Sequence, residues 1–189
     1  MLLRFRVENH RSLRDEQELS LVAASLSDES RGLIELDKKD SLVPVAAIYG
    51  ANASGKSNVI HALEFMRLAV ADSHRSWSPE GPIPRDPFAL APTGTDAPTL
   101  LEVDFRVARV RYRYGFVVDS QRVLEEWLYA WPSGRRQLWF ARDVDETPHF
   151  QFGKHLKGEN RVIQNVTRPN SLFLSAAAQN NHPQLTPLY

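Results

Sequence analysis

A lysine and a serine follow a loop that has glycine at both ends, in the order Gly50-x-x-x-x-Gly55-Lys56-Ser57. This spacing fits the P-loop pattern for binding nucleoside phosphates. Gly50 lets the chain turn tightly, and Gly55 allows torsion angles and a close approach that a Cβ atom would block. The backbone N–H groups between the two glycines then form a nest for an anion.

Lys56 and Ser57 supply the polar side chains that this chemistry requires. Lys56 is predicted to reach the β- and γ-phosphates, and Ser57 to place its hydroxyl on Mg²⁺. A helix that begins near Lys56 would add the positive end of its dipole beneath the phosphates. The predicted cofactors are therefore ATP and Mg²⁺. The alternative interpretation is a structural glycine-rich turn with an incidental lysine.

The segments on either side of the loop have the composition of a strand and a helix. Residues 43–49 contain no polar side chain, which is typical of a central strand in a largely parallel sheet. After the loop, His61, Glu64 and Arg67 recur every three residues, and apolar side chains fill most of the remaining helix surface. We therefore expect a helix that is buried on more than one side, and we assign its apolar residues to the core.

The N-terminal region predicts two short strands. Leu3, Phe5 and Val7 alternate with arginines in residues 1–7, as in a half-buried strand. A polar turn follows at residues 8–12, and residues 18–23 predict a second strand antiparallel to the first. Residues 25–41 predict a loop with one short strand at residues 33–36. Residues 72–97 are rich in proline, serine and glycine and predict a long loop, anchored by Phe88 and Leu90.

The second half of the chain predicts an antiparallel meander. Apolar and polar residues alternate in four runs, at Thr99–Val107, Val110–Val118, Val123–Trp131 and Gln137–Asp143, with short turns between them. Such a sheet has one wet face. Residues 150–157 predict an extra strand or a loop, and residues 170–178 a short helix or a strand-to-helix passage.

Aromatic and basic side chains in the meander allow two interpretations each. Arg106, Arg109, Arg111 and Arg113 could contact a nucleic-acid backbone. We favour ion pairs across the strands, because the comparably numerous acidic residues Glu102, Asp104, Glu125 and Glu126 lie nearby. Trp127, Tyr129 and Trp131 share one face. This face is interpreted as core, or as packing for a partner, in preference to a platform for stacking bases.

The composition limits the class of protein. The 189 residues include 23 acidic and 23 basic side chains, so bulk charge gives no argument for nucleic-acid binding. The absence of cysteine excludes disulfides and thiolate metal sites and suits a reducing compartment. The charged N-terminus is unlike a signal peptide, and no apolar run is long enough to span a membrane. We predict a cytoplasmic protein without a membrane partner.

A P-loop hydrolase usually needs a further acidic residue for Mg²⁺ and water activation. The nearest match is Asp119, at the end of an apolar strand and directly before a turn, and we interpret it as a turn residue. The catalytic residues are therefore unknown. The sequence ends at Tyr189 without a terminating element. We expect the N-terminal part of a longer ATPase, or a gene product truncated before its catalytic acid.

Several of these features together resemble one group of ATPases. The opening residues, with the turn Asn9-His10-Arg11-Ser12, resemble the N-terminus of SMC/RecF-like ABC-type ATPases. The loop spelling G-A-N-A-S-G-K-S-N is similar to the form used in that branch. The later RYRYGF and VLEEWLYAW segments resemble bacterial AAA-family ATPases of the overcoming-lysogenization-defect type. Those ATPases often accompany a Toprim-type nuclease in anti-phage defence.

The resemblance implies further site residues and partners. It places Arg11 and Ser12 near the nucleotide, with a solvated turn cation as the alternative for Arg11. It suggests that Gln179 senses Mg²⁺ and the γ-phosphate, with Gln164 and Gln184 as alternatives. It also implies association of two ATPase heads into a homo-oligomer, and an acidic strand, a signature loop and a switch histidine beyond Tyr189. The phosphate-binding set is Gly50, Ala51, Asn52, Ala53, Ser54, Gly55, Lys56, Ser57 and Asn58.

The predicted fold class is α/β, a P-loop NTPase of the ABC/SMC head type with an antiparallel β-meander subdomain. The predicted division is a P-loop lobe at 1–75, a proline-rich loop at 76–97, the β subdomain at 98–168 and the start of a continuing core at 169–189. The expected function is Mg-ATP binding, with hydrolysis in the full-length protein and control of a nuclease or DNA partner. The alternative is a nucleotide-dependent assembly module without turnover. A small-molecule or nucleotide kinase is disfavoured, because residues 72–97 contain only Arg75 and Arg85 and no arginine-rich lid.

Overall fold

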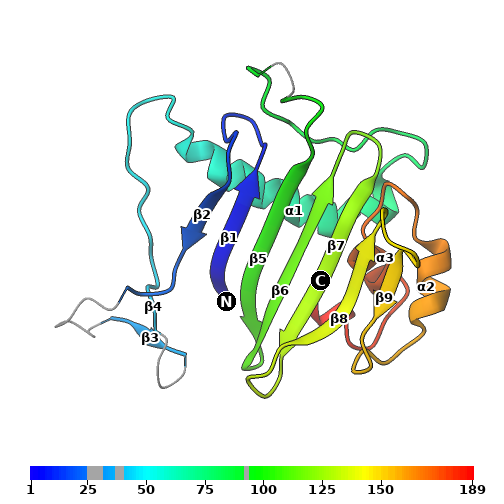
Figure 1. Ribbon diagram of the computed structural model, residues 1–189. Helices are drawn as coiled ribbons and strands as arrows, with labels where there is room; N and C mark the ends of the chain where they lie inside the picture. The colour runs from blue at the N-terminus through cyan, green and yellow to red at the C-terminus, as the bar shows by residue number, and fades with distance from the viewer. Residues whose placement is uncertain (25–31, 37–40, 92–93) are drawn as a thin grey trace.

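Seven strands form one antiparallel sheet in the computed structural model, which describes residues 1–24, 32–36, 41–91 and 94–189 (Figure 1). The order of the strands is β2-β1-β5-β6-β7-β8-β9. A separate pair, β3 and β4, lies away from the sheet. The strands span Leu2–Glu8 (β1), Gln17–Ser20 (β2), Ile34–Glu35 (β3), Ser41–Leu42 (β4), Thr99–Val107 (β5), Val110–Val118 (β6), Val123–Trp131 (β7), Gln137–Asp143 (β8) and Phe150–Phe152 (β9).

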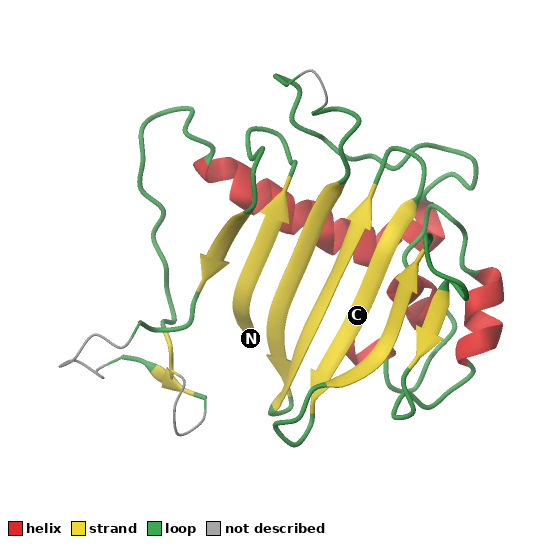
Figure 2. Ribbon diagram, in the orientation of Figure 1, coloured by secondary structure: helices red, strands yellow, loops and turns green. Residues whose placement is uncertain are grey.

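The helices cover one face of this sheet, and no helix of the described residues lies over the opposite face (Figures 1 and 2). The longest, α1, crosses the sheet behind the strands and begins at the residue that the glycine loop predicts. The helices are α1 (Lys56–Ser76), α2 (Asn160–Val166), α3 (Phe173–Gln179) and the 3₁₀ turn η1 (Thr186–Leu188). The fold is therefore two-layered, with a buried core on the helical side and an open sheet face on the other.

The meander is confirmed, and its four predicted strands have the bounds that the sequence pattern gives. The reason is local, because alternation fixes which residues face the core and the short turns fix the register. Ala108 and Arg109 both have positive φ, 47° and 68°, as a two-residue hairpin turn requires. The strand at residues 150–152 falls within its predicted segment, and the short helix at residues 173–179 overlaps the predicted segment 170–178 and ends one residue later. Helix α2 was not predicted.

The N-terminal hairpin belongs to the same sheet as the meander. β1 pairs with β2, as predicted, and on its other edge with β5, with Phe5 opposite Val103. This pairing joins segments that are about a hundred residues apart, so no local pattern indicates it. Strands from the predicted segments 1–75 and 98–168 therefore share one sheet. The division into domains stays a prediction.

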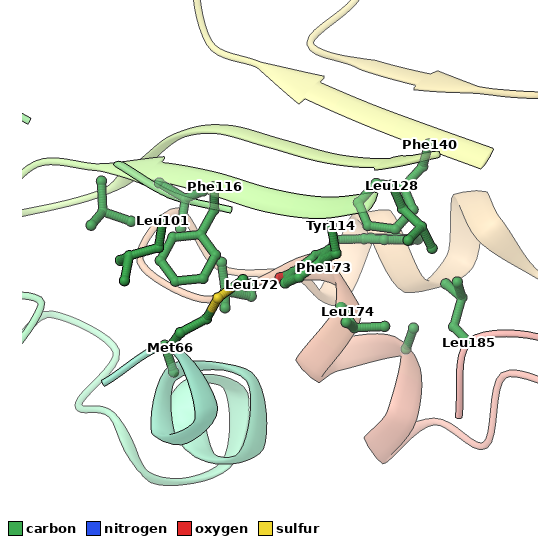
Figure 3. Close-up of a cluster of buried hydrophobic side chains, with 14 of the residues drawn as sticks. Met66, Leu101, Tyr114, Phe116, Leu128, Phe140, Leu172, Phe173, Leu174 and Leu185 are labelled. Atoms are coloured by element: carbon green, nitrogen blue, oxygen red, sulfur yellow. The ribbon is translucent and has the colours of Figure 1, made fainter. Parts of the chain in front are cut away.

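The core lies between the sheet and the two helices α1 and α3 (Figure 3). Side chains from alternate strand positions point toward Met66 of α1 and toward Leu172, Phe173 and Leu174 at the start of α3. The central side chains on the strands are Phe5, Leu101, Tyr114, Phe116, Leu128 and Phe140, all nearly or fully buried. Burial of this apolar surface is the main source of stability for the fold.

Residues 43–49 do not form the predicted central strand. They have no regular secondary structure, and all but Val43 are exposed, with Tyr49 89% accessible. A strand exists only where a neighbour accepts and donates its backbone hydrogen bonds, and no described strand pairs with this segment. Pro44 also lacks an N–H group for such a ladder. The apolar pattern indicated burial, and this structure does not provide it.

Two further expectations about burial are wrong in this structure. Helix α1 buries one face, through Ala62, Met66 and Ala69, while Ile60 and Leu68 are exposed. The long loop begins after Ser76, not at residue 72, and its buried anchor is Ile83, whereas Leu90 is 89% accessible. In both cases the apolar pattern was present, but no described element covers the second face of the helix or the Leu90 side chain.

The aromatic row of β7 lies on the open face and not in the core. Leu128 and Ala130 are fully buried, whereas Trp127, Tyr129 and Trp131, at the alternate positions, remain partly accessible. The prediction that this row is core is therefore wrong, and packing for a partner stays a prediction. The predicted ion pairs form in part, because Arg111 and Arg113 pair with Asp104, and Arg113 also with Glu102. Arg109 and Glu125 form none among the described residues. Arg6 also pairs with Glu102.

Glu126 is on the other side of β7 and is fully buried, so it forms no ion pair on the open face. Its carboxylate accepts hydrogen bonds from the backbone N–H groups of Phe173 (2.6 Å) and Leu174 (3.0 Å) and from the hydroxyl of Tyr114 (3.0 Å). Burial raises the pKa of this carboxyl, although the Leu174 amide and the guanidinium of Arg142 act in the opposite direction. Glu126 thus holds the start of α3 to the sheet.

Polar side chains after α2 fasten the C-terminal end of α1. Arg168 donates to the carbonyl oxygens of His74 (2.9 Å) and Ser73 (2.8 Å), and Asn170 donates to that of Ser78 (2.8 Å). Ser73 in turn accepts from the backbone N–H of Leu172 (3.1 Å). These bonds satisfy backbone groups that a helix end leaves without partners. We call residues 73–78 and 168–175, together with Glu126, the anchored end.

Candidate functional site

The glycine loop has the backbone of an anion nest. Gly55 has φ of 89° and Ala53 has φ of 63°, both in the left-handed region. A Cβ atom on Gly50 would come within 2.8 Å of Ser54 Oγ, and one on Gly55 within 2.8 Å of Ser12 Oγ. Both glycines therefore stand where a side chain would meet its surroundings. This is the role that the spacing predicts for them.

The first turn of α1 faces this loop, and no side-chain cap accepts a hydrogen bond from its backbone N–H groups. Gly55 is the N-cap residue, makes no side-chain cap, and no acidic residue lies in the first turn. The backbone N–H of Asn58 donates to the carbonyl of Gly55 (2.9 Å), but helix N-termini always leave further donors unpaired. The positive end of a 21-residue helix thus points at the loop, which favours a bound anion.

Lys56 lies across the loop. Its ammonium Nζ donates to the carbonyl oxygens of Gly50 (2.9 Å) and Ala51 (2.6 Å), on the exposed side of the molecule. The charge is therefore held by neutral acceptors and has no carboxylate partner among the described residues. Ser57 is exposed beside it at the second helical position. Among the described residues, no group of three or more His, Cys, Asp or Glu side chains could hold a metal ion.

The turn at residues 9–12 packs against the loop from the side of β1. Ser12 Oγ accepts a hydrogen bond from the Asn58 side-chain amide (2.6 Å) and lies next to Gly55. Arg11 has a left-handed backbone, φ 52°, and forms an ion pair with Asp86 (3.0 Å). The structure thus brings Ser12 to the loop and ties Arg11 to the long loop that follows α1.

Asn9 builds this turn and was not singled out by the sequence. It has φ of 53°, which asparagine tolerates better than most residues. Its buried side chain donates to the carbonyl oxygens of Gly94 (2.9 Å) and Ala97 (2.7 Å) and accepts from the N–H of Phe88 (2.9 Å). Asparagine beside a polar turn was the available signal, because it favours left-handed positions.

His10 is a second residue that the sequence did not single out. Its ring is 2% accessible, stacks on Phe65 at 5.9 Å between ring centroids, and has no hydrogen-bond partner for either nitrogen among the described residues. Burial lowers the pKa of this imidazole to about 4, and the nearby charge of Arg11 acts in the same direction. His10 is therefore a neutral ring that packs between the turn and α1.

A hollow of about 260 Å³ opens beside Lys56 and Gly55. Its walls are mostly apolar and come from β1, β2, the segment before the loop and the first turns of α1. Its apolar lining includes Phe5, Val7, Leu19, Tyr49 and Val59. An apolar hollow next to an anion nest suits a ligand that has a flat apolar part and a charged part.

Other predicted residues lie elsewhere. Gln179 donates to the hydroxyl of Tyr189 (3.2 Å), which itself donates to the carbonyl of Ala71 (2.7 Å). Ala71 is about four turns beyond Lys56, about 22 Å along the helix axis. The structure therefore does not bring Gln179 to the loop. Asp119 is confirmed as a turn residue, because its Oδ1 accepts from the backbone N–H groups of Gln121 and Arg122, both at 2.7 Å.

A protein-family model described as “AAA domain, putative AbiEii toxin, Type IV TA system” matches residues 45–189. The chain belongs to this family. The match begins just before the glycine loop and includes α1 and the whole meander. Membership of this family means that the chain is an AAA-type P-loop domain with a nucleotide-binding, ATPase-type function. The chain matches no curated protein. No helix among the described residues is long and apolar enough to cross a bilayer.

Proposed function

We propose that this AAA domain binds Mg-ATP through residues 50–58. In the full-length protein, ATP hydrolysis would control a nuclease or a DNA-processing partner in phage defence. The observation that carries the binding proposal is the arrangement at the start of α1. An ammonium group held by two carbonyl oxygens, a left-handed glycine and a helix N-terminus without a side-chain cap converge on one loop.

Each part of the loop has a distinct role in this proposal. The backbone N–H groups of residues 51–55 and the helix N-terminus would hold the phosphate oxygens. Lys56 would exchange its two carbonyl acceptors for phosphate oxygens, which are charged and bind an ammonium group more strongly. Ser57 would hold Mg²⁺, which supplies charge neutralisation at the phosphates. The apolar hollow beside the loop would receive the base.

The defence role, the Toprim-type nuclease partner and the association of two ATPase heads rest on the resemblance of the turn, loop and meander segments. A plaque assay tests the defence role. Cells that carry the full-length gene should resist phage, and cells that carry its Lys56→Ala variant should not. Equal resistance with both genes would contradict an ATP-dependent role.

A fluorescent ATP analogue tests binding directly. Lys56→Ala should weaken the affinity by roughly ten- to a hundredfold, because a charge-assisted contact is worth about 1.5–3 kcal/mol. The matched control is Lys154→Ala, which removes an exposed lysine far along the chain and should leave the affinity unchanged. An unchanged affinity in Lys56→Ala would exclude the loop as the binding site.

A nucleotide-dependent assembly module without turnover is the second candidate. The observation that favours it concerns the acids near the loop. Among the described residues, Glu18 of β2 is the one carboxylate that lines the hollow beside Lys56, and it lies on an exposed edge strand. Without a positioned acid, phosphoryl transfer loses much of its rate. A phosphate-release assay decides between the candidates. Turnover near 1 per second, a typical enzyme value, that disappears in Lys56→Ala would exclude the second candidate.

A further inference from the structure

The open face of the sheet carries a second cluster of positive charge, far from the glycine loop. A hollow of about 470 Å³ lies where the β5–β6 and β7–β8 turns meet the start of β1. Among the described residues, its charged lining consists of arginines with a single carboxylate, and one indole ring forms part of its wall. These residues are Arg4, Arg106, Arg109, Arg111, Asp104 and Trp131.

The single carboxylate among the described lining residues already accepts hydrogen bonds on both of its oxygens. Asp104 is 3% accessible and accepts three hydrogen bonds, from Arg111 Nη2 (2.8 Å) and from Nε (3.1 Å) and Nη2 (3.0 Å) of Arg113. Burial alone would raise the pKa of its carboxyl, but the bonds from these two arginines hold the pKa below its ordinary value. Asp104 therefore stays ionised and is shared by two guanidinium groups, so among the described residues it leaves no acceptor for Arg4 or Arg109.

The remaining arginines differ in their partners. Arg106 donates to the carbonyl of Leu36 (2.8 Å) and has a further partner, so it carries no part of the argument for free charge. Within the described part of the chain, the guanidinium groups of Arg4 and Arg109 have neither a hydrogen bond nor an ion pair. Arg111 is fixed from two sides, by Asp104 and by stacking on Trp131 at 4.8 Å from the ring centroid. Like charges held together repel unless an anion lies between them, and the fixed guanidinium loses little freedom when it binds one.

We propose that this hollow binds phosphate groups, from either a nucleic-acid strand or a free polyphosphate. Guanidinium forks match phosphate oxygens and form strong charge-assisted bonds with them. Several arginines converging on one hollow suit a ligand with more than one negative charge. The aromatic row Trp127, Tyr129 and Trp131 continues from the hollow along β7, where the bases of a strand could stack.

This site is separate from the nucleotide site. The two hollows share no lining residue, and the arginines lie on the sheet face opposite α1. The inference goes beyond the proposed function and does not depend on it, because it rests on charges and contacts of the open face alone. Its failure and that of the glycine loop can therefore be told apart.

The experiment uses two probes. A fluorescein-labelled single-stranded DNA of about 12 nucleotides without terminal phosphate is followed by anisotropy, and inorganic tripolyphosphate by calorimetry. Both are measured at low salt in the full chain and in its Lys56→Ala variant, where the glycine loop is disabled. The test variant is Arg4→Gln combined with Arg109→Gln. Neither side chain has a bond to lose, so the fold should persist, which a urea titration verifies.

We expect the double variant to bind at least one probe about tenfold more weakly or worse, in both backgrounds. Arg122→Gln, which removes an arginine paired with Asp119 at the other end of the sheet, should leave binding unchanged. Tighter binding of the oligonucleotide, with a steep salt dependence, identifies nucleic acid as the source. Tighter binding of tripolyphosphate identifies a free polyphosphate. No binding of either probe, an equal loss in Arg122→Gln, or abolition by Lys56→Ala would overturn the proposal.

Discussion

The two ends of α1 are built in opposite ways. At the anchored end, Arg168, Asn170 and Ser73 satisfy backbone groups through bonds of 2.8–3.1 Å, most of them partly or fully buried. At the other end, residues 50–58 are mostly exposed, the helix has no cap, and Lys56 rests on neutral carbonyl groups. The loop and the turn at residues 9–12 together are called the loop end below.

This difference separates structural polar groups from binding groups. A buried polar group without a partner costs free energy, so the anchored end pairs its donors and acceptors and contributes stability. An exposed donor that points at a shaped loop costs little and is available to a ligand. We therefore expect changes at the anchored end to lower stability, and changes at the loop end to lower nucleotide affinity first.

The largest expected effect is at Glu126. Glu126→Ala removes a fully buried carboxylate and leaves two amide N–H groups, the Tyr114 hydroxyl and the charge of Arg142 without compensation. The expected loss is about 3–5 kcal/mol in the free energy of unfolding, measured by urea titration. Nucleotide affinity of the remaining folded protein should be unchanged.

Glu125 provides the matched control for this experiment, because it is the neighbouring residue on the same strand but is exposed. Glu125→Ala should change the free energy of unfolding by no more than about 0.5 kcal/mol. Equal losses in the two variants would show that the Glu126 bonds do not hold α3, and the contrast between the two ends of α1 would lose its basis.

His10 gives the next largest effect and sharpens the comparison, because it is the buried, unpartnered group of the loop end. Its folded pKa of about 4 lies below the ordinary value of 6.5. Above pH 6.5 the ring is neutral in both states. Between pH 6.5 and 4 the unfolded chain takes up a proton that the folded chain refuses, so stability falls as the pH falls. The total is about 3 kcal/mol.

Thermal unfolding between pH 7.5 and 4.5 measures this loss. The pKa values of His74 and His182 are lowered too, mainly by burial, and add to the loss, whereas the raised pKa of Glu126 opposes it. His10→Phe keeps a ring against Phe65 and should flatten the slope without lowering stability at pH 7.5. A slope that is identical with and without His10 would exclude this residue as the cause.

The meander and the loop could be predicted from the sequence because their determinants are local. Alternation in β5 to β8 and the spacing of Gly50, Gly55 and Lys56 each act over a few residues. Which side of the sheet α1 covers is not determined by local sequence. Trp127 and Leu128 are both apolar, and only packing against α1 and α3 decides which of them is buried.

Long-range pairing explains the remaining errors. Residues 43–49 have the composition of a buried strand, but a strand forms only beside partners, and the sequence does not show whether they are present. The bond from Asn58 to Ser12 and the ion pair of Arg11 with Asp86 join residues 46 and 75 positions apart. The structure brings Ser12 to the loop, so its predicted place near the nucleotide stays a prediction, while Gln179 lies at the far part of α1, beside Tyr189.

Gly55 tests the backbone of the loop end. Gly55→Ala places a side chain at φ of 89°, which costs about 1–2 kcal/mol, and its Cβ would come within 2.8 Å of Ser12 Oγ. Stability should fall by this amount and nucleotide affinity should fall with it. Gly134→Ala is the control, because its φ of 76° imposes a similar strain in open space. Gly134→Ala should lower the stability by a similar amount and leave the nucleotide affinity unchanged. Equal affinity losses would mean that the effect is not specific to the loop.

The smallest effect is expected at Ser12, where the two properties can be compared in one bond. Ser12 Oγ accepts from Asn58 Nδ2 at 2.6 Å on the exposed surface, so Ser12→Ala should cost only about 0.5–1 kcal/mol of stability. The same bond fixes the first turn of α1, and with it the direction of the N–H groups of the loop. Nucleotide affinity should therefore fall about two- to fivefold, which is the affinity equivalent of that energy.

Ser120→Ala, in an exposed turn at the same end of the sheet, should change neither stability nor nucleotide affinity. A loss of stability in Ser12→Ala without any loss of affinity would place this residue with the anchored end, as a structural group, and would break the division drawn between the two ends of α1.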